Sequence, residues 1–221
     1  RQPALYLKLP SRGEYWPEDA IKMPVNGELA VYPMTTRDEI TLRTPDALMN
    51  GAGVVSVIQS CCPSIKDAWS MPSVDVDMTL IAIRIASYGP TMSIGSKCPH
   101  CGEEHDYDIN LGQVLDKITM PDYSEPLELD KGVYAQLRPL NYRQVSHAGS
   151  ISFEEEQLLR SLVDSNMPDE EKRQKYNEHL DRMITLNVES ATNCTASITA
   201  DGVEVTNPEH IKEYYTNSNA T

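Results

Sequence analysis

Two stretches of the chain repeat the same order of structural signals, and this repetition constrains the fold more than any other feature. "NGELAVYPMTTRDE" (26–39) and "DKGVYAQLRPLNYRQ" (130–144) both run from a glycine through a strand-like segment to Pro33 or Pro139. Each proline is followed by a helix-capping residue and then by Arg37 or Arg143. The pattern predicts an α+β fold made of duplicated units, each a β-hairpin with helices.

Two further matches follow in the same order along the chain. "SCCPSI" (60–65) and "NCTASI" (193–198) share Cys-x-x-Ser-Ile, and "MPSVDVDM" (71–78) and "TNPEHIKE" (206–213) both place a proline before a helix. The spacing from Pro139 to Cys194 is about twice that from Pro33 to Cys61. The second copy is therefore expected to contain a helical insertion at about 152–178, and the native chain to continue past Thr221.

The sequence divides into four segments on this interpretation. Residues 1–20 form an N-terminal extended arm, 21–90 the first repeat, 91–120 a hairpin with a Cys-Pro-x-Cys-Gly tip, and 121–221 the second repeat. Hairpins are predicted at Asn26-Gly27, at "LELDKGVYAQLRPL" and at Asp201-Gly202.

Helices are predicted from capping signals and from apolar periodicity. Thr36 and Glu39 fit a capping box, and a further helix is expected to open at Thr44-Pro45-Asp46. An apolar helix is expected to run to about Cys62, where Pro63 stops it. Residues 75–89 predict a helix with one buried face, made up of Met78, Ile81, Ile85 and Tyr88. The charged stretch 153–190 predicts helices with a break near "NMPDEE".

The arm from Leu5 to Trp16 is the first candidate for binding a partner. Tyr6, Tyr15 and Trp16 are large aromatic residues with little sequence around them to bury them, and such residues suit interfaces. The alternative is that the arm packs on its own domain. If the arm is a contact, deleting residues 1–18 should prevent assembly and spare folding.

Cys98-Pro-His-Cys101 is compatible with a redox pair, with half of a zinc site, or with neither. A redox pair needs a helix N-terminus to stabilise the thiolate, whereas here Gly102 and a strand follow. The strand is expected to be half-buried, because Tyr107, Ile109 and Leu111 alternate with polar residues.

Zinc fits a Cys-Pro-x-Cys-Gly hairpin tip better than redox chemistry does, with Cys98, Cys101 and His105 as candidate ligands. A closed zinc site needs four ligands, and the chain has no second Cys-x-x-Cys. His100 lies within the turn itself, and Cys61 or Cys62 could serve if the fold brings them near. The alternatives are a hairpin that persists without metal and a disulfide formed after release. Cys61 and Cys194 themselves are interpreted as small buried hydrophobes at equivalent places of the two copies.

Charge and motifs exclude several classes of protein. The formal net charge is −14, which opposes a nucleic-acid or anionic-membrane surface. No apolar run approaches the roughly 20 residues that span a bilayer. The sequence contains no hydrolase elbow, phosphate-binding glycine loop or deaminase pair, so we expect no enzyme. Five cysteines without a dense disulfide spacing indicate synthesis in a reducing cytoplasm.

Several motifs together resemble the baseplate hub subunit family of contractile-tailed bacteriophages related to T4. They are "LPSRGEYWP", "VYPMTTRDEITLRTPDALMNG", "VIQSCCPSI", "DVDMTLIAIRIASYG" and "CPHCGEEHDYDINL". The resemblance runs from about Leu9 to the end. It implies a structural tail component or, alternatively, an assembly factor or chaperone that the virion does not retain.

The same resemblance implies the surroundings of such a subunit. Its partners would be other baseplate, hub or tail-tube proteins in an assembly of threefold or sixfold symmetry. It would be made in the host cytoplasm and located in the virion. A thiol-redox enzyme and a zinc-ribbon nucleic-acid binder remain rival classes. The first predicts a thiol-exchange rate, and the second predicts binding at low salt.

Overall fold

The chain forms two compact units in the computed structural model, Arg1–Met120 and Pro121–Thr221. The structure describes residues 2–45, 51–163 and 167–217. The architecture mixes helices with antiparallel strand pairs, as an α+β fold does. The helix expected to open at Thr44–Asp46 falls largely outside the described residues.

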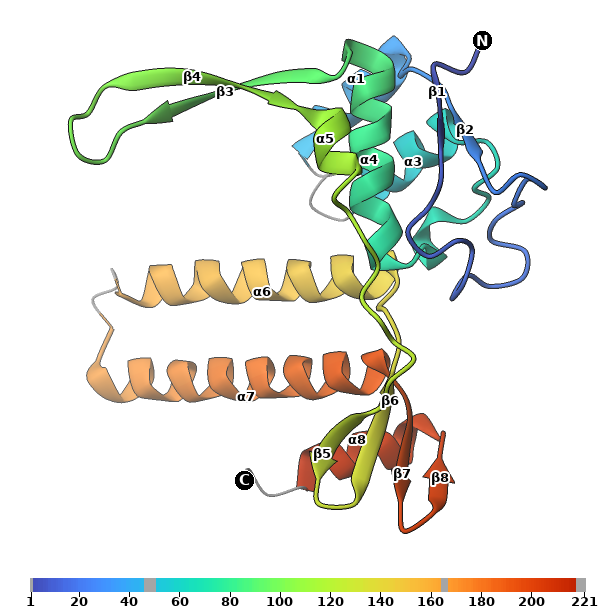
Figure 1. The fold of residues 1–221 in the computed structure, drawn as a ribbon. Coiled ribbons are helices and arrows are strands. Elements are labelled where there is room, and N and C mark those ends of the chain that lie inside the picture. Colours follow the sequence, from blue (N-terminus) through green and yellow to red (C-terminus); the bar gives the residue numbers. More distant parts are fainter. Residues whose placement is uncertain (1, 46–50, 164–166, 218–221) are drawn as a thin grey trace. The chain divides into compact units, whose positions relative to one another are not determined.

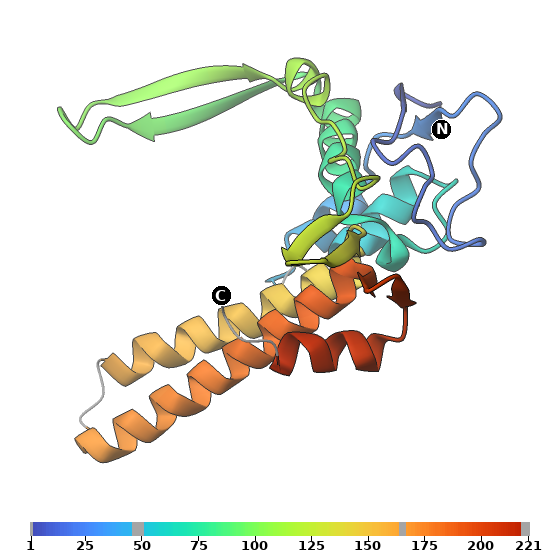
Figure 2. The ribbon, with the colours of Figure 1, turned by 60° about the horizontal axis from the view of Figure 1, so that its bottom comes forward.

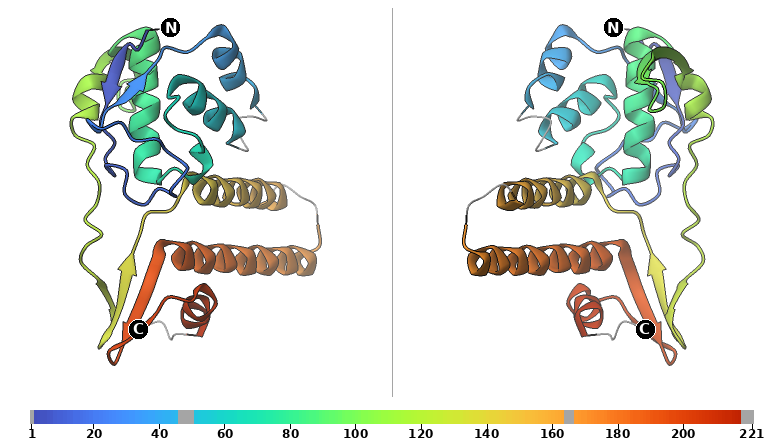
Figure 3. Two further views of the ribbon diagram at one scale, coloured as in Figure 1. Left: turned by 90° about the vertical axis from the view of Figure 1, so that its right-hand side faces the viewer. Right: turned by 90° about the vertical axis from the view of Figure 1, so that its left-hand side faces the viewer.

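Unit 1 begins with a strand pair that the sequence did not predict. β1 (Leu5–Leu7) pairs antiparallel with β2 (Leu29–Val31) (Figures 1 and 3). The hairpin predicted across Asn26-Gly27 is therefore wrong, although Gly27 does make a turn, its N–H donating to the Pro24 carbonyl at 2.9 Å. Pro24 has no N–H to donate to a neighbouring strand, so the segment before Gly27 pairs poorly with β2. The edge of β2 is instead paired by β1, from the distant N-terminal segment.

Helical segments follow β2 in the described part of unit 1, ahead of the hairpin of residues 91–110. They are α1 (Thr36–Leu42), α3 (Ala52–Cys61), the 3-10 turn η1 (Ala68–Ser70) and α4 (Ser73–Tyr88). The cap of α1 lies one residue earlier than predicted: Thr35 is the N-cap, and it forms a capping box with Asp38. The predicted pair, Thr36 and Glu39, lies inside the helix.

The core of unit 1 lies between β1, β2, α3 and α4. It includes Leu7, Leu29, Val31, Ile58, Cys61 and Ile65, all of them buried. Helix α4 presents a different face to this core from the predicted one. Asp75, Val76, Thr79, Ala82 and Ile83 are buried, whereas Tyr88, from the predicted face, is exposed.

Unit 1 ends with a long two-stranded hairpin and a short helix. β3 (Thr91–Lys97) pairs antiparallel with β4 (Glu104–Asn110), and α5 (Leu111–Leu115) follows directly (Figure 1). The Cys-Pro-His-Cys turn lies at the tip, as predicted. The strand β4 is not half-buried, however: Tyr107 is exposed, Ile109 is partly covered, and Leu111 is buried as the first residue of α5.

Unit 2 is built on an antiparallel sheet of four strands. In sheet order they are β5 (Leu127–Asp130), β6 (Val133–Leu137), β7 (Thr195–Ala200) and β8 (Val203–Val205). The long helices α6 (Tyr142–Val163) and α7 (Asp169–Cys194) connect β6 to β7 along the chain. They run side by side in opposite directions (Figure 2). α8 (Pro208–Asn217) completes a core with Ala135, Ile198 and Ile211.

Each unit contains a hydrogen bond and a capping box of the same kind around its proline, Pro33 or Pro139. The residue before each proline donates its N–H to the carbonyl of a helix-ending cysteine: Tyr32 to Cys61 and Arg138 to Cys194, both at 2.8 Å. The residue two places after each proline begins a capping box. In unit 1 this box joins Thr35 and Asp38, and in unit 2 it joins Asn141 and Gln144.

Candidate interaction site

The aromatic residues of the N-terminal arm differ in their exposure. Tyr6 lies on β1 with 62% of its surface exposed, and Tyr15 is also exposed. Trp16 is half-buried, and its indole Nε1 donates to a carboxylate oxygen of Asp75 at 2.8 Å. Tyr6 is therefore open to a partner, whereas Trp16 is anchored within its own unit.

Asp75 holds the arm against the first turn of α4. Its fully buried carboxylate accepts hydrogen bonds from the Ser11 N–H at 2.9 Å, from the Ser11 hydroxyl and from Trp16. Burial raises the pKa of Asp75, and the three hydrogen bonds oppose this rise. The only signal in the sequence was an acidic residue at a helix start, which has a simpler explanation in the helix dipole.

The arm is thus part of the folded unit. Leu7, Leu9 and Ser11 are buried, and β1 supplies a strand to the sheet. The expectation that deleting residues 1–18 would spare folding is wrong, because this deletion removes core side chains together with the donors to Asp75.

The hairpin tip gathers its two thiols in a tight turn. The Cys98 N–H donates to the Glu103 carbonyl at 2.8 Å, and the Gly102 N–H donates to the Cys98 carbonyl at 2.9 Å. Gly102 has a φ of +78°, which favours glycine. Backbone N–H groups of Cys101 and His100 donate to the Cys98 sulfur and lower its pKa.

The predicted third ligand does not join the two thiols. His105 Nε2 lies 3.7 Å from the Glu103 carboxylate, and its ring is next to Tyr107. Within residues 2–45, 51–163 and 167–217, no three His, Cys, Asp or Glu side chains gather as a metal site. The tip by itself therefore does not fit a closed four-ligand zinc site, and zinc binding remains a prediction.

The other cysteines of unit 1 are enclosed in the core. Cys61 and Cys62 are fully buried, and burial, with Cys61 beside it, raises the pKa of Cys62 to about 12. A thiol with such a pKa stays protonated at neutral pH, which suits a small core hydrophobe. In unit 2 Cys194 is half-buried, and its thiol donates to the Ala191 carbonyl at 3.3 Å.

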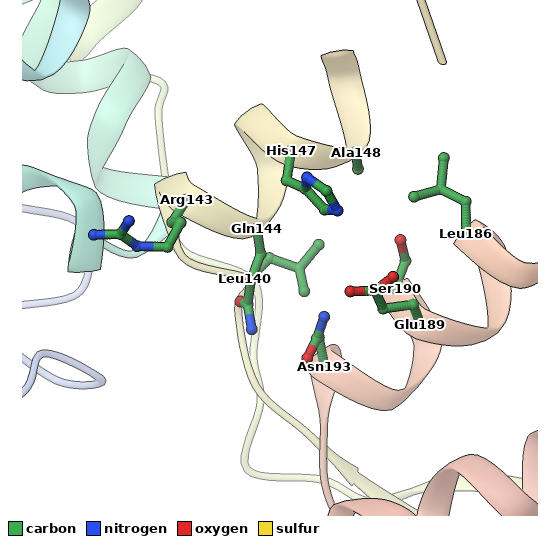
Figure 4. Close-up of a pocket in the computed structure, with 9 residues that line it drawn as sticks. All are labelled: Leu140, Arg143, Gln144, His147, Ala148, Leu186, Glu189, Ser190 and Asn193. Atoms are coloured by element: carbon green, nitrogen blue, oxygen red, sulfur yellow. The ribbon is translucent and has the colours of Figure 1, made fainter. Parts of the chain in front are cut away.

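A pocket of about 370 Å³ lies between α6 and α7 near the ends that join the sheet (Figure 4). His147 and Gln144 of α6 face Glu189, Ser190 and Asn193 of α7 across it. No local pattern in the sequence indicates this pocket, because the residues that face His147 are more than forty positions away.

Farther along the same helix pair lies an ionic network in which Glu155 and His179 are buried and Arg182 is exposed. The Glu155 carboxylate accepts from His179 Nδ1 at 2.8 Å and from Arg182 at 2.9 Å. The bonds from Arg182 and His179 lower the pKa of Glu155. Both carboxylate oxygens are therefore occupied by partners of α7, and the network joins the two helices.

Comparison with known proteins identifies the family. A family model described as T4 bacteriophage base plate protein matches residues 17–216. No curated protein and no solved structure matches the chain. In the part of the chain that the structure describes, every helix is too short or too polar to span a bilayer. The match covers nearly all of both units, and the chain therefore belongs to the T4 bacteriophage base plate protein family.

Proposed function

We propose that this protein is a hub subunit of a contractile phage tail baseplate and acts by binding neighbouring subunits. The family match over residues 17–216 carries this proposal, since the family indicates a structural role in a phage tail baseplate. The finer assignment to the hub rests on the resemblance of the sequence motifs. The same family supports a role in assembly rather than catalysis.

The distribution of exposed apolar residues supports a role in binding. Each unit has its own core, yet large apolar side chains remain at the surface of both. They include Tyr6, Ile94 and Tyr107 in unit 1 and Tyr134, Tyr176 and Ile184 in unit 2. Subunits held permanently in an assembly bury surfaces of this kind against their neighbours.

The partners in this proposal are other baseplate, hub or tail-tube proteins, arranged with threefold or sixfold symmetry. The net charge of −14 favours basic protein partners over nucleic acid or an anionic membrane. In the N-terminal arm, Tyr6 is the residue best placed to make such a contact, with the exposed Tyr15 as a second candidate; Trp16 is held by Asp75.

The duplication of a hairpin-plus-helices unit is part of the proposal. The matching hydrogen bonds around Pro33 and Pro139, and the matching capping boxes, support it. The helical pair α6–α7 would then contain the insertion predicted at about 152–178. A duplicated unit would give the subunit two related surfaces.

The alternative is an assembly factor that helps to build the hub and then leaves. Both roles predict that a phage with this gene deleted makes no complete contractile tails, visible by electron microscopy of the lysate. Normal tails from the deletion would contradict both roles. The composition of finished particles separates them.

A further inference from the structure

The hairpin β3–β4 carries an apolar face that is partly covered at Met92 and Ile109 and exposed farther out, at Ile94 and Tyr107. Met92 lies opposite Ile109, and Ile94 lies opposite Tyr107, and because alternate residues share a face, all four form one row, here called the apolar stripe. Ile94 is 40% exposed and Tyr107 is 56% exposed. The alternation in "YDIN" is typical of a strand with one covered face, yet that face is only partly covered in this chain.

The hairpin is also a sheet of only two strands. Within the described residues no third strand pairs with β3 or β4, so both outer edges keep backbone groups free for pairing. Two-stranded hairpins are at best marginally stable in water without further packing. The length of the pair and its open face indicate that it is completed by another protein.

The charge of the hairpin selects the kind of partner. Residues 91–110 contain four acids, Glu103, Glu104, Asp106 and Asp108, against a single cation, Lys97. Three of the acids lie on β4, on the face opposite the apolar stripe. A second copy of this strand would place acid opposite acid, which is destabilising.

We propose that the β3–β4 hairpin is a docking arm for a basic partner protein. An extended segment of that partner, in which Lys or Arg alternates with apolar residues, adds to the free edge of β4. Its basic side chains lie opposite Glu104, Asp106 and Asp108, and its apolar side chains extend the apolar stripe. The inference rests on the proposed function, because it names the surface that holds the subunit in the tail.

Two pairs of substitutions test the arm in the phage that encodes the protein. Asp106→Lys with Asp108→Lys reverses the charge of β4, and Ile94→Ser with Tyr107→Ser removes the two exposed residues of the apolar stripe at constant charge. We expect each pair to lower the yield of infectious particles by about tenfold or more, since like-charge or unfilled contacts cost several kcal/mol.

The matched control is Glu128→Lys with Glu204→Lys. These two exposed acids lie on β5 and β8, the edge strands of the four-stranded sheet of unit 2. The control therefore makes the same change in net charge as the reversal on β4. We expect it to change the yield by no more than about twofold, as surface substitutions usually do. Circular dichroism of each purified variant must match the wild type, which excludes unfolding as the cause.

The outcomes distinguish this inference from the proposed function. If deleting the gene abolishes tails but both arm variants assemble normally, the arm inference is wrong and the baseplate role stands. If the control pair lowers the yield as much as the charge reversal does, the loss does not come from docking at the β3–β4 hairpin, and the inference is again wrong. Normal tails after gene deletion overturn the baseplate role itself.

Discussion

Asp75 is the residue on which the N-terminal segment depends most directly. It is fully buried and accepts two hydrogen bonds from Ser11 and one from Trp16. Both residues are more than fifty positions away in the sequence. Removing this acceptor leaves an indole N–H and a backbone N–H in the core without a partner, which is costly.

We expect Asp75→Ala to lower the free energy of unfolding of unit 1 by about 2–3 kcal/mol. Both tryptophans of the chain, Trp16 and Trp69, lie in unit 1, so urea unfolding followed by tryptophan fluorescence reports on this unit. Asp77→Ala, an exposed acid on the same helix, is the control and should change the stability little. If both substitutions lowered the free energy of unfolding equally, Asp75 would not be holding the N-terminal segment on α4.

The lowered pKa of Glu155 makes the stability of unit 2 depend on pH. Its pKa is lowered in the folded protein by Arg182 and His179, so the folded state holds its proton less tightly than the unfolded state. The stabilisation is therefore complete above the ordinary pKa of 4.5 and is lost as the pH falls through the lower folded value.

We expect Glu155→Gln to destabilise unit 2 by about 1–3 kcal/mol at pH 7, and this deficit to shrink towards pH 3. Urea unfolding followed by circular dichroism at several pH values measures it. The exposed neighbour Glu156, changed to Gln, serves as the control. A deficit for Glu155→Gln that is constant over this pH range would contradict the assigned network.

At the scale of elements, the sequence predicted most local structure correctly. The hairpins at Cys98–Cys101, at 127–137 and at Asp201-Gly202 are present, as are the helices ending at Cys61 and Gly89. These elements are specified by turn residues, caps and periodicity within a few positions. Pairing of β1 with β2 was missed, because its partners are distant and the nearby Asn-Gly turn suggested a local hairpin.

The buried face of α4 was also mispredicted for a physical reason. Apolar periodicity favoured Met78, Ile81, Ile85 and Tyr88, whereas the buried face contains Asp75 and Thr79. Asp75 is acceptable there because Ser11 and Trp16 supply its hydrogen bonds from the arm, whereas the buried Thr79 hydroxyl has no hydrogen-bond partner among the described residues. Likewise, the pocket at His147 depends on the pairing of α6 with α7, which no local pattern shows.

Two glycines test the assigned turn and helix of unit 2. Gly202 has a φ of +77° in the β7–β8 turn, whereas Gly149 lies inside α6, and an added methyl group meets open space at both. We expect Gly202→Ala to destabilise by about 1 kcal/mol and Gly149→Ala to stabilise by about 0.5–1 kcal/mol. Thermal melting followed by circular dichroism measures both, and the same sign for the two would contradict the assigned backbone.

At the scale of the whole molecule, the family was recognisable from motifs that are mostly structural. Those motifs now have physical roles: the capping box at Thr35, the helix-ending Cys61 and the glycine cap at Gly89. They identify the fold of a baseplate protein and do not reveal its neighbours. The surfaces that bind neighbours are specified by open faces such as the apolar stripe, and those faces are evident only once the strands are paired.

The most direct test of the central claim is quantitative mass spectrometry of purified particles of the phage that encodes this protein. We expect a built-in hub subunit to give peptides at a constant number of copies per particle, near a multiple of about three or six. A chain that is abundant in infected cells but absent from finished particles would contradict the claim and identify an assembly factor.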